Sequence, residues 1–198
     1  MAQQRWRRQS TGWIYRAIKP GFPGTALPSP WPRPPIPSSL RRFHSNTAMK
    51  SLLVYGSTWG NTKKVVQRLP EWLSFPIDIV NVSTLTDDRL FADYDLLVFF
   101  TSTSGDQELQ ADMESFFVGC RPGLNGKFYA VCELGNYFGY DDFDFGAERI
   151  LSHLLRQGGG QELIPPFSMD TFPGRDWNSL GRWCGLLNDA VQKRDARY

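Results

Sequence analysis

The stretch GSTWGNT, residues 56–62, combines residue types that can hold an anion. It follows the short apolar run Ser51–Tyr55 and leads into a stretch that reads as a helix. Its polar side chains are short hydroxyls and one amide, at Ser57, Thr58, Asn61 and Thr62. The free N–H groups and the dipole of a helix start favour a negative charge. A phosphate monoester therefore fits this first loop, although no Lys or Arg lies within it.

The first loop differs from the two best-known phosphate motifs. It lacks the Gly-Lys-Ser/Thr ending of a Walker loop and the GxGxxG pattern of a dinucleotide fingerprint. The alternative interpretation is an ordinary strand-to-helix turn with a Ser, Thr or Asn cap. The choice between a phosphate-binding loop and an ordinary turn depends on other parts of the chain.

Two later segments also carry unusual side chains at the ends of apolar runs. The second loop, Thr101–Met113, reads TSTSGDQELQADM and is rich in hydroxyls. The third loop, Glu133–Gly146, reads ELGNYFGYDDFDFG and mixes aromatic with acidic residues. Such aromatics could sandwich a flat ring, and the acids would destabilise a ring that gains negative charge. The alternative is that Phe143 and Phe145 belong to the core and that the acids form a solvated surface.

The elements that must position these loops alternate along the chain. Strands are expected at SLLVY (51–55), IDIVNV (77–82), DLLVFFTSTSG (95–105), KFYAVCELGN (127–136) and QELI (161–164). Helices are expected at residues 61–73, with Pro70 ending or kinking the first, and at 112–120, 145–159 and 177–192. This alternation predicts an α/β domain with a parallel sheet and helices on both faces. Ligands of such sheets bind beyond the carboxyl ends of the strands, where the three loops lie.

Charge is segregated along the chain. Residues 1–50 contain nine Lys or Arg and no acid, whereas the other 148 residues contain 13 Lys or Arg and 20 Asp or Glu, a difference of −7. An acidic body argues against a nucleic-acid partner, because phosphate backbones require a positive surface. It fits a basic protein partner or a cationic ligand.

The cysteines and histidines favour neither a metal site nor a disulfide framework. Cys120, Cys132 and Cys184 are widely spaced, and His44 and His153 are the two histidines. We interpret the cysteines as buried, reduced thiols. No apolar run approaches the roughly 20 residues that span a bilayer, so no membrane partner is expected.

Residues 1–48 form a basic segment with eight prolines and three tryptophans. It has no periodicity, and we exclude it from the folded domain, which we expect at residues 49–192. It could be an organellar targeting segment, with RRFHS at Arg41–Ser45 as a processing site. It could instead be a mis-called start, with translation beginning at Met49, and the high proline content favours this over an amphipathic targeting helix. A third possibility is a basic tail that touches a partner.

The three loops together resemble those of the flavodoxin family. LVYGSTWGNTKKVVQRL resembles its phosphate-loop signature, with Tyr55 before the loop and Ser57, Gly60 and Thr62 at the expected spacing. STSGDQELQADM and GNYFGYDDFDFGA resemble its second and third flavin loops. The resemblance runs from about Met49 to about Val191.

The resemblance implies a flavodoxin-like three-layer sandwich with a five-stranded parallel sheet of order 2-1-3-4-5. It implies non-covalently bound FMN and one-electron transfer through a stabilised semiquinone. The residues that would hold the phosphate are Ser57, Thr58, Trp59, Gly60, Asn61 and Thr62. Those along one side of the flavin ring would be Ser102, Thr103, Ser104, Gly105 and Asp106. Those along the other side would be Gly135, Asn136, Tyr137 and Tyr140, with Tyr140 the preferred stacking residue.

Three positions depart from the family pattern. Trp59 stands where a hydroxyl residue is common, so one side-chain donor is lost. Ser104 stands where many members have a tryptophan over the flavin. Asn136 replaces the usual Asp after Gly135, which removes one acid near the ring. These departures bear on the redox potential rather than on the type of cofactor.

The leading functional hypothesis is an FMN electron carrier that shuttles single electrons between a reductase and an acceptor. The alternative is a flavodoxin-like NAD(P)H:quinone oxidoreductase, and a third hypothesis is a regulatory module without a redox role. The expected partners are basic redox proteins such as a flavodoxin reductase. We expect a cytoplasmic monomer, or an organellar protein if residues 1–48 are a genuine targeting segment.

Overall fold

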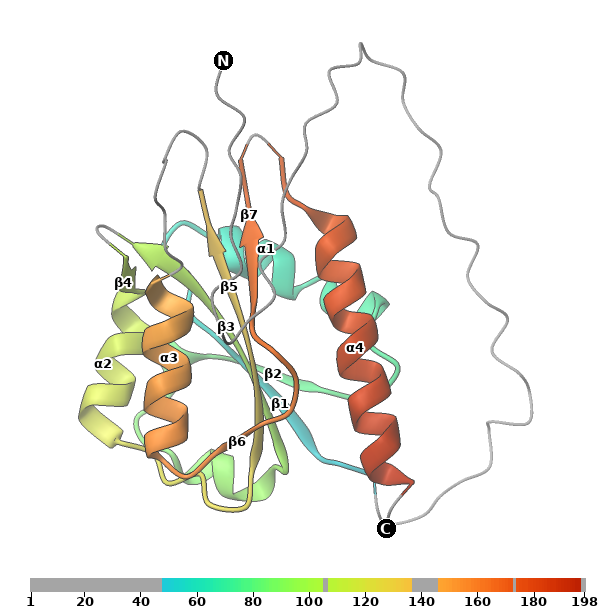
Figure 1. Ribbon diagram of the computed structural model, residues 1–198. Coiled ribbons are helices and arrows are strands. Elements are labelled where there is room, and N and C mark those ends of the chain that lie inside the picture. Colours follow the sequence, from blue (N-terminus) through green and yellow to red (C-terminus); the bar gives the residue numbers. More distant parts are fainter. Residues whose placement is uncertain (1–47, 105–106, 137–145, 173, 197–198) are drawn as a thin grey trace, which may run out of the picture. The chain divides into compact units, whose positions relative to one another are not determined.

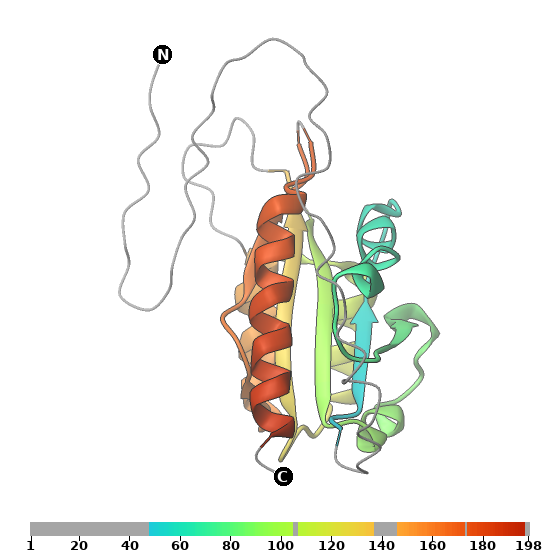
Figure 2. The same cartoon turned by 90° about the vertical axis from the view of Figure 1, so that its right-hand side faces the viewer.

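The computed structural model describes residues 48–104, 107–136, 146–172 and 174–196. A central sheet lies between α2 and α3 on one side and α4 on the other (Figure 1), and α4 runs along the sheet (Figure 2). The strands are β1 (Ser51–Tyr55), β2 (Asp78–Asn81), β3 (Leu96–Ser104), β4 (Glu108–Leu109), β5 (Phe128–Gly135), β6 (Gln161–Glu162) and β7 (Phe167–Asp170). The helices are α1 (Asn61–Val66), α2 (Ala111–Cys120), α3 (Gly146–Gln157) and α4 (Trp177–Asp195), with short 3-10 helices η2 (Leu69–Glu71), η3 (Val82–Thr84) and η4 (Arg89–Asp93).

The sheet has the strand order β2-β1-β3-β5-β6, and the pairs along this path are parallel. The two-residue β4 pairs antiparallel with β3 and only extends a hairpin from its end. The predicted three-layer sandwich and strand order 2-1-3-4-5 are therefore confirmed, since β4 shifts the numbering but adds no strand to the parallel path.

The core lies on both faces of the sheet. On one face Leu53 packs in a cluster with residues of α1 and α4, and on the other Leu52 and Val54 pack with residues of α2 and α3. This explains why the first strand is an unbroken apolar run. Each fully buried side chain of this kind contributes roughly 1.5–3 kcal/mol of transfer free energy.

The fifth strand position is divided, which the sequence analysis did not predict. The predicted strand at QELI is reduced to Gln161–Glu162, and Phe167–Asp170 pairs with β5 further along. Pro165 and Pro166 lie between the two pieces. Because proline has no N–H to donate, the ladder is interrupted there.

No helix is predicted between the second and third strands, and the structure has only η3 and η4 between β2 and β3. Local side-chain bonds explain this: the Asn81 carboxamide accepts from Ser83 N–H at 3.1 Å, and Asp87 accepts from Arg89 N–H at 3.0 Å. Such bonds offer the backbone an alternative to a regular helix. The prediction for Pro70 is confirmed, because α1 ends at Val66 and Pro70 lies in the separate 3-10 helix η2.

The three cysteines are free thiols, but they differ in exposure. Cys132 and Cys184 are buried, as interpreted from the sequence, whereas Cys120 is half-buried. Burial raises the pKa of Cys184 to about 12, and burial, followed by the neighbouring Cys184, raises that of Cys132.

Residues 1–47 lie outside the described part of the chain, so the interpretations of that segment and of the domain boundary stay predictions. Among the described helices, none has the length and apolar character needed to cross a bilayer. In the same residues, no group of three His, Cys, Asp or Glu side chains is placed to hold a metal ion.

Candidate functional site

The three loops follow strands that end at the same edge of the sheet, and the described contacts join them. The first loop continues the β1 ladder, since Gly56 N–H donates to the Phe100 carbonyl of β3 at 3.0 Å. The first and second loops are joined by Gln110, whose Nε2 donates to Thr58 Oγ1 at 3.3 Å. The second loop also meets the end of the third, where a Cβ on Gly146 would lie 2.2 Å from the Gln107 carbonyl oxygen.

The first loop presents hydrogen-bond donors. Ser57 Oγ accepts from Lys63 N–H at 3.3 Å, and Asn61 Oδ1 accepts from Arg175 Nη2 at 2.9 Å. Thr58 Oγ1 is the acceptor for Gln110. With their oxygens used as acceptors inside the protein, the hydroxyl hydrogens and the amide NH2 group can serve a ligand.

The backbone of the first loop adds to these donors. Gly60, with φ of 79°, is in the left-handed region that glycine tolerates, and α1 starts directly after it. First-turn N–H groups have no partner inside a helix. Among the described residues, none accepts a hydrogen bond from the N–H groups of Asn61 and Thr62. A group that only accepts hydrogen bonds, such as a phosphate monoester, fits this set.

Gln110 is a residue of the second loop that the sequence analysis did not single out. It is buried, and its Oε1 caps α2 by accepting from Met113 N–H at 3.0 Å. A Cβ on Gly56 would lie 2.2 Å from that Oε1. Gly56 is therefore required for the first loop to approach the cap of α2. The signal in the sequence was a glutamine two residues before the helix predicted at 112–120.

Arg175 was also missed. It lies in the segment between β7 and α4 and reaches the first loop through its bond to Asn61. More than one hundred residues separate the two, with |i−j| of 114, so no local pattern could join them.

The second loop forms a tight hairpin. Thr103 and Ser104 of β3 pair with Leu109 and Glu108 of β4, and Gln107 has a positive φ of 71°. Ser102 and Thr103 are half-buried near the carboxyl end of β3. Ser104 belongs to β3 by its backbone. The predicted ring-flanking residues Gly105 and Asp106 lie outside the described residues.

The third loop begins at the end of β5. The Gly135 carbonyl accepts from both the N–H and the hydroxyl of Thr171 at 2.8 Å, which ties β5 to the segment after β7. Asn136 is exposed. Tyr137 and the preferred stacking residue Tyr140 lie outside the described residues, so their predicted role is not tested.

A buried carboxylate lies beneath these loops. Glu133 of β5 is fully buried, with Oε2 accepting from Thr103 Oγ1 at 2.9 Å and from Glu148 N–H at 2.7 Å. Its Oε1 accepts from Ser168 Oγ at 3.0 Å. Glu133 thus links β3, β7 and the start of α3. Its signal in the sequence was an acid inside the apolar run FYAVCELG.

Glu148, at the start of α3, lies beside the Glu133 carboxylate. Burial raises the pKa of Glu148, the Ser152 hydroxyl opposes this shift, and the Glu133 carboxylate adds to it. Thr101 Oγ1, one strand away in register with Glu133, is buried with no partner among the described residues. The base of the site is therefore polar.

Trp59 projects from the first loop into solvent. Its side chain is 89% exposed, the highest value among the large apolar residues found exposed in the described chain. The indole therefore adds apolar surface to the rim of the site. Phe172, 46% exposed, adds to the same edge from the segment after β7.

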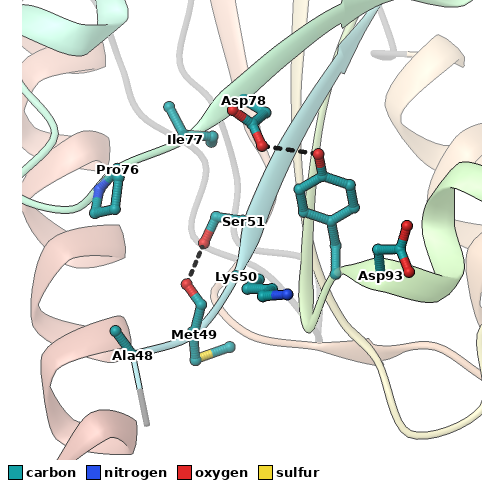
Figure 3. Close-up of a pocket in the computed structure, with 9 residues that line it drawn as sticks. Ala48, Met49, Lys50, Ser51, Pro76, Ile77, Asp78 and Asp93 are labelled. Atoms are coloured by element: carbon teal, nitrogen blue, oxygen red, sulfur yellow. Dashed lines mark hydrogen bonds between the residues drawn. The ribbon is translucent and has the colours of Figure 1, made fainter. Parts of the chain in front are cut away.

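A surface depression of about 370 Å³ lies at the opposite end of the sheet (Figure 3). Its lining includes Ser51 and Asp78, the first residues of β1 and β2. The Tyr94 hydroxyl donates to Asp78 at 2.8 Å, and this bond, followed by burial, raises the pKa of Tyr94. Because ligands of parallel sheets bind beyond the carboxyl ends, this depression is not the predicted cofactor site.

Comparison with known proteins identifies close similarity to one family. The family model described as Flavodoxin matches residues 53–176. The flavodoxin of Maridesulfovibrio salexigens is 30% identical over 152 residues, which cover 72% of this chain and 99% of that protein.

Solved structures share the fold. The Streptococcus pneumoniae TIGR4 flavodoxin matches with a TM-score of 0.60 and 23% identity, covering 75% of this chain and 99% of its own. A Fusobacterium nucleatum flavodoxin bound to flavin mononucleotide matches with a TM-score of 0.56 and 15% identity, covering 76% and 99%.

Proposed function

The chain belongs to the flavodoxin family, and from this premise we propose how its residues hold FMN and support electron transfer. The protein is an FMN-binding electron-transfer flavodoxin, and the quinone reductase alternative is not favoured. The observation that carries the proposal is that the family match, residues 53–176, spans all three loops that the fold gathers at one edge of the sheet.

The first loop is the proposed phosphate site. The Ser57 and Thr58 hydroxyls and the Asn61 NH2 group are the side-chain donors, because their oxygens already accept bonds from the protein. The backbone N–H groups of Trp59, Gly60, Asn61 and Thr62 complete the set. Trp59 contributes no side-chain donor to the phosphate, since its indole is 89% exposed.

The second and third loops are the proposed ring site. The residues on one side are Ser102, Thr103, Ser104, Gly105 and Asp106, and those on the other are Gly135, Asn136, Tyr137 and Tyr140. Glu133 holds the bases of both loops from below through Thr103 and the start of α3. FMN supplies the redox chemistry, and the protein supplies binding, orientation and an acidic environment.

The function implies redox partners. We propose that these partners present a basic surface, because the chain from residue 51 onward has 13 Lys or Arg against 20 Asp or Glu. A monomer acting in the cytoplasm is part of the same proposal, and an organellar location is the alternative if residues 1–48 are a targeting segment.

The test is an absorbance spectrum of the purified protein after addition of FMN, followed by slow anaerobic reduction. We expect bound flavin, a build-up of the one-electron-reduced form, and no NAD(P)H oxidation until a separate reductase is added. A matched control is free FMN under the same conditions. Flavin that passes directly to the two-electron form while NAD(P)H is consumed would favour the reductase, and absence of flavin binding would contradict both.

A further inference from the structure

Arg175 is the one cation that the described structure places in hydrogen-bond contact with a side chain of the first loop. Its Nη2 donates to Asn61 Oδ1 at 2.9 Å. Since the oxygen of the Asn61 carboxamide is turned toward Arg175, the NH2 group of the same carboxamide is turned away from it. The guanidinium therefore fixes which end of the amide is available to a ligand.

The guanidinium keeps unused donor capacity. Its Nε is buried and has no hydrogen-bond partner among the described residues, and no ion pair of Arg175 occurs among them. The nearest carboxylate in sequence, Asp176, is used to cap α4 by accepting from Ser179 N–H at 3.0 Å. A buried N–H without a partner is costly, so the site favours an acceptor close to Arg175.

We propose, on the basis of the function proposed above, that Arg175 is a positioning residue for the FMN phosphate. It orients the Asn61 amide so that the NH2 group serves the phosphate, and it places a positive charge beside a loop whose own donors are neutral. The segment between β7 and α4 thereby becomes a fourth part of the cofactor site.

The competing explanation is purely structural, with Arg175 only bridging the start of α1 to the segment before α4. The two explanations differ in which flavin should lose affinity when Arg175 is replaced. A structural bridge would affect every flavin equally, whereas a phosphate-directed charge acts on FMN and not on riboflavin, which has the same ring and no phosphate.

The experiment measures dissociation constants of the full-chain apoprotein for FMN and for riboflavin by quenching of flavin fluorescence. The variants are Arg175→Met, Arg175→Gln and the control Lys193→Met, which removes the same charge from the exposed last turn of α4. Thermal unfolding of each apoprotein reports on the fold.

Arg175→Met is expected to weaken FMN binding about tenfold or more, the usual size for loss of a charge-assisted hydrogen bond. The affinity for riboflavin should change less than about twofold, which is the size of effect expected for a substitution that removes no contact with the ligand. Arg175→Gln keeps a donor for Asn61 and should lie between wild type and Arg175→Met. Lys193→Met should match the wild type.

Added salt supplies a second readout, since screening should weaken FMN binding by the wild type more than by Arg175→Met. Equal weakening of FMN and riboflavin, or no change in either, would overturn the proposal. If Arg175→Met does not fold, the same comparison is made with Arg175→Gln. A larger rise in its dissociation constant for FMN than for riboflavin supports the proposal, and equal rises overturn it. A wild-type protein that binds neither flavin would instead overturn the proposed function, and this inference with it.

Discussion

At Gly56 the first loop touches the buried side chain that caps α2. The hydrogen atom of glycine leaves room for Gln110, whose carboxamide bonds both to Thr58 and to the first turn of α2. One residue without a side chain therefore allows the phosphate site and the second loop to share a contact. This is a requirement for space, and not for an unusual backbone angle.

Substitution of Gly56 tests this contact. Gly56→Ala would place its Cβ 2.2 Å from Gln110 Oε1, so Gln110 must move and the cap of α2 is weakened. We expect a loss of about 1–3 kcal/mol in the free energy of unfolding and weaker FMN binding. Urea unfolding and FMN titration measure the two effects.

Gly119→Ala is the matched control, since a Cβ at this position in α2 meets nothing within 4 Å. It should stabilise the protein by about 0.5–1 kcal/mol, because alanine favours a helix more than glycine does. Equal losses in the two variants would contradict the role assigned to Gly56.

The cysteines differ in reactivity for the same reason that they differ in burial. In the native protein a thiol reagent should modify Cys120 rapidly, and Cys132 and Cys184 only after unfolding. Thiol titration before and after denaturant measures this. Rapid native modification of Cys184 would contradict its burial.

The same burial predicts a pH dependence. The folded pKa of Cys184, about 12, is above the ordinary value of 9.0, so the unfolded thiol ionises first as pH rises. Its contribution to stability is complete below about pH 9 and is lost as pH rises from there toward about 12. Urea unfolding at pH 8 and pH 10.5 should show the decline, and Cys184→Ala should show a smaller one.

At the scale of the elements, Glu133 joins parts that the chain connects only distantly. Its carboxylate accepts bonds from Thr103 on β3, Ser168 on β7 and the N–H of Glu148 on α3. The hydroxyl and N–H donors compensate for removing the charge from water. Glu133 thus adds side-chain links to the backbone ladders that already pair β5 with β3 and with β7.

Glu133→Ala should therefore lower the free energy of unfolding by about 2–4 kcal/mol, because it leaves three half-buried donors without this acceptor. Glu133→Gln keeps the shape and one carbonyl oxygen, and the hydroxyls can rotate to suit it, so it should cost about 1 kcal/mol or less. Glu114→Gln, an exposed acid on α2, is the control and should change little. An alanine variant as stable as this control would refute the linking role.

At the scale of the whole molecule, the described residues from 48 onward form two core clusters, one on each face of the sheet. Each is built from residues between Leu52 and Val191. The charges follow the same division, since all 20 acids lie in the body, from residue 51 onward. We therefore expect the body to fold and to bind FMN by itself.

A chain that begins at Met49 tests this expectation. Its urea midpoint and its affinity for FMN should equal those of the full chain within error, because no core residue is removed. The two proteins should differ in the salt dependence of electron transfer, since the truncation removes the eight Lys or Arg of residues 1–48 and no acid. A truncated chain that aggregates or loses FMN binding would show that the first segment is needed for the fold.

The sequence alone determined the class of fold, the strand order, the family and the place of the first loop. The fold class and the first loop follow from local patterns, since SLLVY is long enough and apolar enough to be a buried strand and GSTWGNT places its donors at the start of a helix. The family and the strand order follow from the resemblance of the three loops to those of flavodoxins. The sequence did not predict the division of the fifth strand, where two prolines without an N–H interrupt the ladder.

Only the tertiary structure brought Arg175 to Asn61, Gln110 to Thr58 and Glu133 to Ser168. In the sequence these residues looked like a loop arginine, a residue before a helix and an acid in a strand. Their roles depend on which side chains the sheet and its crossovers bring within about 3 Å, a separation that a hydrogen bond requires and that no spacing along the chain encodes.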